Sequence, residues 1–180
     1  MSNENISNPK NFQKEADNII SMDISTVKNL QLGYHGETIF LYKAEDENFV
    51  LKEYIGGLSG SEYYAEVTAN RIKTTIRYGR REEVNRGTYV EVFLPESWHG
   101  ELQLFSQYGN IITEENWSFE RFAAETMEGS ISLKEISAPR IRMSCPVGSI
   151  RFDKATGFAD LHSVSGSITA GLIDGGAKLE

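Results

Sequence analysis

Cysteine occurs once in the 180 residues of this sequence, at Cys145. A lone cysteine excludes an intramolecular disulfide, and it excludes metal sites that are built from paired thiolates. Long hydrophobic runs are also missing, because no stretch of about 18 apolar residues could form a membrane-spanning helix. The polar segment from Met1 to Lys10 lacks the apolar core of a secretory signal. We therefore expect no direct membrane insertion by this chain, and a cytoplasmic location stays open.

Positive charge is scarce as well. The chain has 18 Lys and Arg against 26 Asp and Glu, which gives a net charge of -8 and a pI near 5.0. Such a field repels phosphate backbones, so nucleic acid is not expected as a partner. Hydrophobic residues make up 39% and charged residues 24% of the chain, as in folded soluble proteins. A length of 180 residues suits one domain.

Helical spacing of apolar residues is nearly absent. It occurs from Asn11 to Met22, where Phe12, Ala16, Ile19 and Ile20 predict a short amphipathic helix. Residues 1–25 would then form a polar amino-terminal arm, with this helix or without order. Turn residues divide the following part of the chain into six short segments that are rich in β-branched and aromatic residues, which predict strands. These segments are Val27–Leu32, Thr38–Tyr42, Phe49–Ile55, Tyr63–Ala69, Arg71–Tyr78 and Gly87–Leu94.

A repeat of about nineteen residues dominates the second half. Its marker is a glycine that is followed two residues later by isoleucine, and the glycines lie 20, 19 and 18 residues apart. Small or apolar residues also recur three, five and seven positions before each glycine. The repeated pairs are Gly109 with Ile111, Gly129 with Ile131, Gly148 with Ile150, and Gly166 with Ile168.

Inward positions two apart are typical of strands with one buried face. We expect the glycine to turn the chain between two such strands, using a positive φ. The sequence thus predicts an all-β, single-domain β-solenoid over residues 26–176, with clear repeats at 101–173. A β-sandwich remains the alternative fold. Residues 177–180 resemble the remainder of an expression tag.

The repeats follow a strand from Tyr89 to Pro95 that ends in Leu-Pro. This order of motifs resembles the bacterial "putative adhesin" domain of the DUF4097 type, also described as the toastrack domain, over residues 26–176. The resemblance implies a stack of β-strands, occurrence in cell-envelope and envelope-stress proteins, and no established enzymatic activity.

The sequence predicts no catalytic residue, no cofactor and no metal site. Asp160, His162 and Ser165 contain the side chains of a nucleophilic triad, but the first two are expected to face solvent. The carboxylates Glu114, Glu115, Glu125, Glu128, Asp153 and Asp160 could bind calcium, although a solvated face is the favoured interpretation. Likewise, the arginines Arg77, Arg80, Arg81 and Arg86 could contact a phosphate or an anionic glycan, although an exposed loop is favoured.

Aromatic residues are the remaining candidates for ligand contact, because their rings stack on sugars where they are exposed together. The predicted contacts are Trp98, Trp117 and Tyr108, with Tyr34, Tyr63 and Tyr64 as further members. We expect a non-enzymatic binding or scaffold module for another protein or an envelope polymer or glycan. A carbohydrate-active enzyme is the alternative. The open strand edge after Ile173 also predicts edge-to-edge homodimers.

Overall fold

The computed structural model describes residues 15–81 and 87–180, and within these ranges it contains strands and no helix. The prediction of an all-β fold is confirmed. The six predicted segments of the first half each contain a strand. The strands are β1 (Asn18–Met22), β2 (Asn29–Tyr34), β3 (Thr38–Lys43), β4 (Phe49–Tyr54), β5 (Glu66–Ala69), β6 (Lys73–Arg77), β7 (Tyr89–Leu94), β8 (Glu101–Ser106), β9 (Ile111–Ser118), β10 (Arg121–Thr126), β11 (Ser130–Ser144), β12 (Val147–His162), β13 (Ser165–Asp174) and β14 (Ala177–Leu179).

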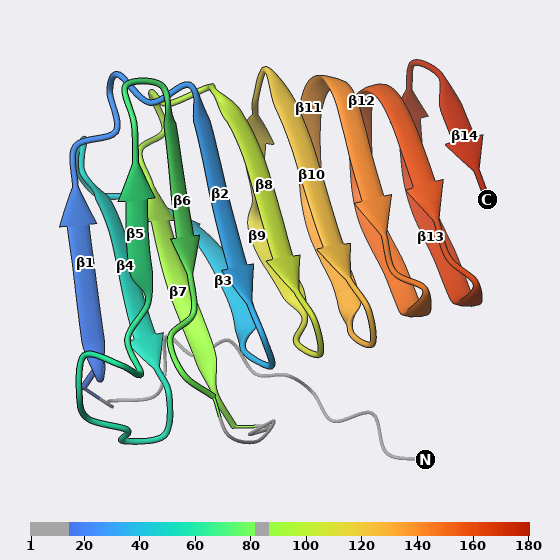
Figure 1. The fold of residues 1–180 in the computed structure, drawn as a ribbon. Coiled ribbons are helices and arrows are strands. Elements are labelled where there is room, and N and C mark those ends of the chain that lie inside the picture. Colours follow the sequence, from blue (N-terminus) through green and yellow to red (C-terminus); the bar gives the residue numbers. More distant parts are fainter. Residues whose placement is uncertain (1–14, 82–86) are drawn as a thin grey trace.

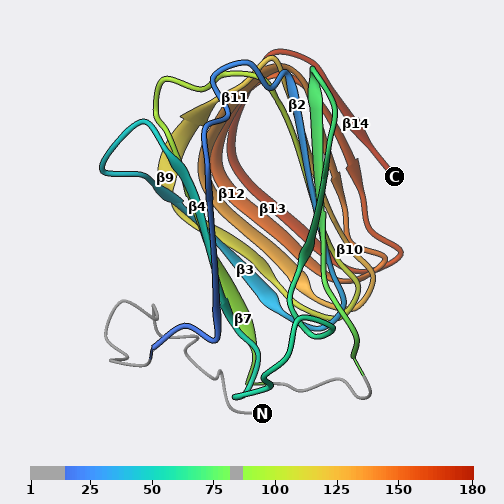
Figure 2. The ribbon, with the colours of Figure 1, turned by 60° about the vertical axis from the view of Figure 1, so that its left-hand side comes forward.

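The strands form one continuous sheet that curls back on itself, so that two rows of strands enclose a common interior (Figures 1 and 2). In Figure 1 the front row contains β6, β2, β8 and β10 side by side, and β3 and β9 belong to the back row. The long strands β11 and β12 belong to both rows. Their first halves pair in the back row with β9 and β13, and their second halves pair in the front row with β10 and β14.

A front strand and the back strand that follows it make one layer of the stack, which we call a rung. Successive rungs pair in parallel and in register, so equivalent residues lie opposite one another. Ile131 pairs with Ile111 on one side and with Ile150 on the other, and Ile150 pairs with Ile168. Isoleucine therefore occupies the same place in these neighbouring rungs.

The interior is filled by the inward residues of these rungs. One row of the interior consists of Leu104, Ala124, Met143 and Leu161, all of which are buried. Three residues before Gly109, Gly129 and Gly148, a side chain donates to a carbonyl of the preceding rung. Ser106 Oγ donates to the Glu37 carbonyl at 2.8 Å, Thr126 Oγ1 to the Gly109 carbonyl at 2.9 Å, and Cys145 Sγ to the Gly129 carbonyl at 3.1 Å. These bonds satisfy polar groups that the turn buries.

The repeat glycines are needed for close stacking rather than for an unusual backbone angle. A Cβ atom at Gly109, Gly129, Gly148 or Gly166 would lie only 1.6–2.1 Å from a carbonyl oxygen of the preceding rung. Of these four glycines, Gly148 alone has a positive φ, at 139°. The expectation that all four glycines turn the chain through positive φ is therefore wrong, because the lack of space selects glycine at this position.

The predicted helix at 11–22 is wrong where the structure describes it, and residues 11–14 lie outside the described residues. Asn18 to Met22 form β1, which pairs antiparallel with β4. The unpaired edge of β4 supplies hydrogen-bond partners, and the adjacent β-branched residues Ile19 and Ile20 favour an extended backbone. Tertiary pairing thus overrides the weak helical pattern.

The two ends of the stack differ. At the β1 end, the antiparallel strands β1, β4 and β5 close both rows. At the other end, β13 pairs with β12, and β14 extends the front row through residues 177–179, which pair in register with Ala159 to Leu161. No helix in the described part of the chain is long and apolar enough to cross a membrane.

Candidate binding face

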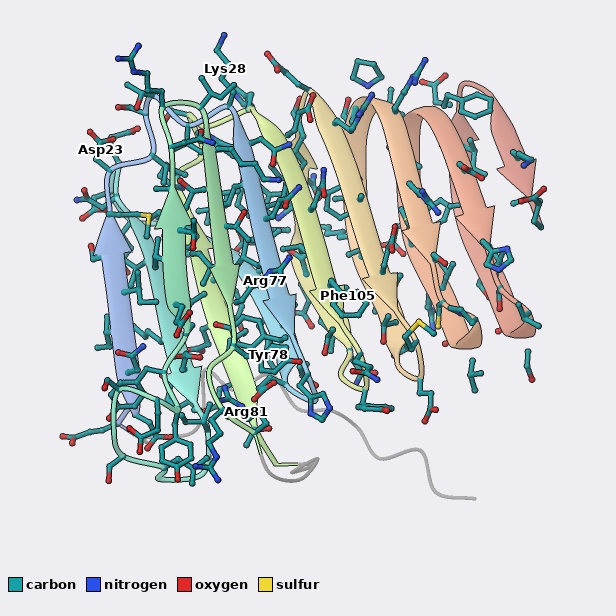
Figure 3. All side chains as sticks on the ribbon, in the orientation of Figure 1. Asp23, Lys28, Arg77, Tyr78, Arg81 and Phe105 are labelled. Carbon is teal, nitrogen blue, oxygen red and sulfur yellow. The ribbon has the colours of Figure 1, made fainter. Side chains whose placement is uncertain are left out.

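The outer surface of the front row carries the most varied chemistry of the molecule. Because side chains alternate along a strand, every second residue of β6, β2, β8 and β10 points away from the interior. In Figure 3, Arg77, Tyr78 and Phe105 lie on this surface. The outward residues of its central part are Thr75 and Arg77 of β6, Gln31 and Gly33 of β2, Gln103 and Phe105 of β8, and Ala123 and Glu125 of β10.

These residues surround a shallow depression of about 420 Å³, here called the front depression. Its floor is low because Gly33 and Ala123 stand between larger outward side chains. Register places Gly33 between Arg77 on one side and Phe105 on the other. The rings of Phe105 and Tyr78 border the depression and are 37% and 36% exposed. The depression thus combines two accessible aromatic rings with a guanidinium group.

An amide pair crosses the depression. Gln31 Nε2 donates a hydrogen bond to Gln103 Oε1 at 2.8 Å. This bond uses one donor of Gln31 and one acceptor site of Gln103, and each amide group has further donors and acceptors for a ligand. Since both glutamines project from strands in the middle of the row, their positions are fixed before any ligand arrives.

Comparison with known proteins supports the fold at low sequence identity. The chain shares its fold with a solved "putative adhesin". That protein, from Parabacteroides distasonis ATCC 8503, is 12% identical, and the match covers 90% of this chain and 77% of the other at a TM-score of 0.51. A "putative cell adhesion protein" from Clostridium sporogenes ATCC 15579 is 11% identical over 91% of this chain and 98% of its own, at a TM-score of 0.46. No family model and no curated protein matches the chain.

Of the six aromatic residues that the sequence singles out, three lie in the interior, and Tyr63, Tyr64 and Tyr108 are half-buried. Trp98 and Trp117 are only 6% and 5% exposed, and Tyr34 is fully buried. The indole nitrogen of Trp98 donates to the Val27 carbonyl at 2.7 Å, and that of Trp117 donates to Thr113 Oγ1 at 3.1 Å. Tyr108 is half-buried in the turn before β9, where its ring meets His35 edge-on. The two tryptophans are therefore packed into the fold and are not exposed together on its surface.

The predicted arginine cluster separates into different environments. Arg77 is exposed on the front face, whereas Arg81 is buried and forms an ion pair with Glu37 at 2.5 Å and a longer one with Glu53 at 3.6 Å. Arg81 also donates to the carbonyl of Tyr63 at 2.6 Å. The positive charge of Arg81 is thus paired with carboxylates inside the fold. Arg86 lies outside the described residues.

Other chemistry-bearing residues are dispersed. Asp160 and His162 lie in the part of β12 that belongs to the front row, and Ser165 begins β13 beyond the next turn. Among the described residues, no three His, Cys, Asp or Glu side chains gather closely enough to hold a metal ion. The carboxylates considered for calcium do not form such a group either. Glu125 lines the front depression, and no second carboxylate lines it among the described residues.

Cys145 is expected to be a slow-reacting thiol. Its side chain is fully buried and donates to the Gly129 carbonyl at 3.1 Å, and burial raises the pKa of the thiol. Because the thiolate is the reactive species, labelling by a disulfide reagent at pH 8 should be roughly 100-fold slower in native protein than in denaturant. Immediate labelling of native protein would contradict the buried position.

Proposed function

We propose that the chain is a non-enzymatic, adhesin-like binding module that holds an extended glycan on the front face. The observation that carries the proposal is the front depression, where the rings of Phe105 and Tyr78 border a floor that is lowered at Gly33. The apolar faces of sugar rings stack on exposed aromatic side chains. The name of the Parabacteroides protein, which refers to adhesion, agrees with such a role.

Polar groups of the depression suit sugar hydroxyls. The amides of Gln31 and Gln103 offer both donors and acceptors, and Arg77 offers a planar fork of donors. These groups project from neighbouring paired strands, so binding would order few side chains and lose little conformational entropy. An open, shallow surface also fits a long polymer better than a small molecule, which usually needs a concave pocket that buries most of its surface.

We further infer that the fold is a β-solenoid of repeats of about nineteen residues, and that residues 26–176 form one domain of the toastrack type. The parallel register of Ile111, Ile131, Ile150 and Ile168 supports this inference. A role at the bacterial cell envelope, including the sensing of envelope stress, follows from the family resemblance. Glycine and isoleucine at the repeat positions serve the stack and not the ligand.

The binding proposal is tested by calorimetric titration of the protein with a panel of polysaccharides, envelope polymers and lipid vesicles. We expect saturable binding to a polysaccharide, and Phe105→Ala should raise the Kd about fivefold because the loss of a stacking ring removes roughly 1 kcal/mol. Met127→Ala is the matched control, since Met127 is also an exposed apolar side chain but lies in the turn after β10.

Two outcomes would overturn the proposal. If Phe105→Ala and Met127→Ala weaken binding equally, the front depression is not the binding site. Turnover of a polysaccharide, detected as new reducing ends, would instead favour a carbohydrate-active enzyme, which needs carboxylates on both sides of the scissile bond.

A further inference from the structure

A second depression adjoins the first on the same face. It has a volume of about 710 Å³ and lies over β10 and the second halves of β11 and β12. Gln103, Ala123 and Glu125 border both depressions, so the two form one continuous path across the front strands. The path runs along the axis of the stack, at right angles to the strands.

Three arginines gather at the second depression: Arg121, Arg140 and Arg142. All three are exposed, in a chain whose net charge is -8. Arg121 and Arg140 stand at equivalent positions of adjacent parallel strands, immediately before the paired residues Phe122 and Ile141. Like charges at neighbouring positions of a sheet repel one another. A bound anion between these two guanidinium groups would offset that repulsion.

The arginines are only weakly neutralised by the protein. Arg142 Nε lies 3.6 Å from Glu125 Oε1, and both side chains are largely exposed, so this pair contributes little. Within residues 15–81 and 87–180, no carboxylate lies within ion-pairing distance of Arg121 or Arg140. Both guanidinium groups therefore keep donors for a carboxylate, which they match in a bidentate geometry.

Phe158 provides an apolar surface next to these charges. It pairs in register with Arg140, is 48% exposed and borders the same depression. The second depression thus repeats the combination of an accessible ring and guanidinium groups that marks the front depression. Both lie on one line across the rungs.

We propose that the ligand is an acidic polysaccharide that lies along the stack axis and places its carboxylates on Arg121, Arg140 and Arg142. This inference rests on the proposed function. Neighbouring strands are about 4.8 Å apart, a spacing comparable with the length of one sugar unit in an extended chain, so successive sugars can meet successive strands. Glu125 and Asp160 accept hydrogen bonds from sugar hydroxyls, and their charges disfavour the densely charged polyphosphates and sulfated polymers.

The test compares one polymer backbone with and without its charge. Calorimetry is carried out with polygalacturonate and with the same polymer after full methyl esterification, and alginate and hyaluronate are added as further uronic acid polymers. We expect at least one acidic polymer to bind, esterification to raise the Kd of polygalacturonate about tenfold or more if that polymer binds, and added salt to weaken binding. Equal binding of the charged and esterified polymers would overturn the inference.

Matched variants locate the charge contacts. Arg121→Gln combined with Arg140→Gln should raise the Kd of the acidic polymer about tenfold, because two exposed charge contacts of roughly 0.7 kcal/mol each are lost. Lys134→Gln combined with Arg151→Gln removes the same charge from exposed positions of the back row and should change the Kd less than twofold. Equal effects of the two double variants would show that net charge alone attracts the polymer, and would overturn the proposed site.

The two proposals fail in different ways. If a neutral polymer binds in a manner that Phe105→Ala weakens, and no acidic polymer binds better, the glycan-binding function stands and the acidic ligand is wrong. If no polysaccharide binds, both are wrong. Tighter binding of polyphosphate or of anionic vesicles than of any uronic acid polymer would also overturn the acidic polysaccharide as the ligand.

Discussion

Replacing Arg81 by methionine is expected to lower the free energy of unfolding by about 3–5 kcal/mol. The guanidinium group is the positive partner of two buried carboxylates, those of Glu37 and Glu53. Without it, two negative charges remain buried near each other. Glu53 already accepts hydrogen bonds from Asn18, Tyr34 and the Ala65 amide, so it cannot move readily to water.

Chemical denaturation followed by fluorescence measures this effect. Arg142→Met is the control, because its side chain is 64% exposed, and it should change stability by less than about 0.5 kcal/mol. Adding Glu37→Gln and Glu53→Gln to Arg81→Met should restore part of the loss by removing the stranded charges. A loss below about 1 kcal/mol for Arg81→Met would show that the ion pairs contribute little to stability.

Gly129→Ala is expected to destabilise the protein by about 3 kcal/mol. The added Cβ would lie 2.1 Å from the carbonyl oxygen of Gly109 and 2.7 Å from Thr126 Oγ1. Because the carbonyl belongs to a strand-to-strand turn of the preceding rung, the two rungs would have to separate. The broken contact also includes the hydrogen bond from Thr126 to that carbonyl.

Gly33→Ala is the matched control for this substitution. The nearest heavy atom to a Cβ at Gly33 is Arg77 Cγ at 4.0 Å, and Gly33 lies within β2 without a positive φ. The stability of the Gly33→Ala variant should be unchanged or slightly raised, because alanine loses less backbone entropy than glycine on folding. Equal thermal unfolding midpoints for the two variants would contradict the role of close packing at Gly129.

The strands were predictable because the residues that form them carry local signals. Val90 and Val92 alternate with outward residues in β7, and polar turns such as 45–48 separate the segments clearly. The register of the second half was also accessible, because the glycine and isoleucine positions recur with almost constant spacing. Inward positions five before the glycine, such as Leu104 and Met143, are indeed buried.

One rung could not be recognised from this spacing. Strands β2 and β3 stack on β8 and β9, with Ile39 opposite Ile111, yet they lie 72 residues earlier in the chain. Glu37 stands at this turn where the later rungs have glycine. Its carbonyl accepts a hydrogen bond from Ser106, just as the carbonyl of Gly109 accepts one from Thr126 in the next rung. Leu30 and Leu32 keep the inward spacing, which was the remaining signal.

The candidate binding face was not predicted, for a different reason. Sequence reasoning selected tryptophans by residue type, although both are buried and pack against the core residue Phe119. Outward residues also recur with the repeat, because Arg121, Arg140 and Phe158 each lie eight residues before a repeat glycine. Without the front row in three dimensions, nothing indicated that these positions share one surface with Arg77 at the end of β6 and with Tyr78, which follows it.

The separation between β2 and β8 affects the order in which the molecule assembles. From β8 onward, each rung contacts a segment about 20 residues away, as in the bond from Ser130 to Asn110. Joining the first rung to β8 instead closes a loop of 72 residues, which contains β4 to β7. Larger loops lose more entropy on closure and form more slowly. We therefore expect the end of the stack that the inserted strands close to assemble last, after the later rungs have formed from local contacts.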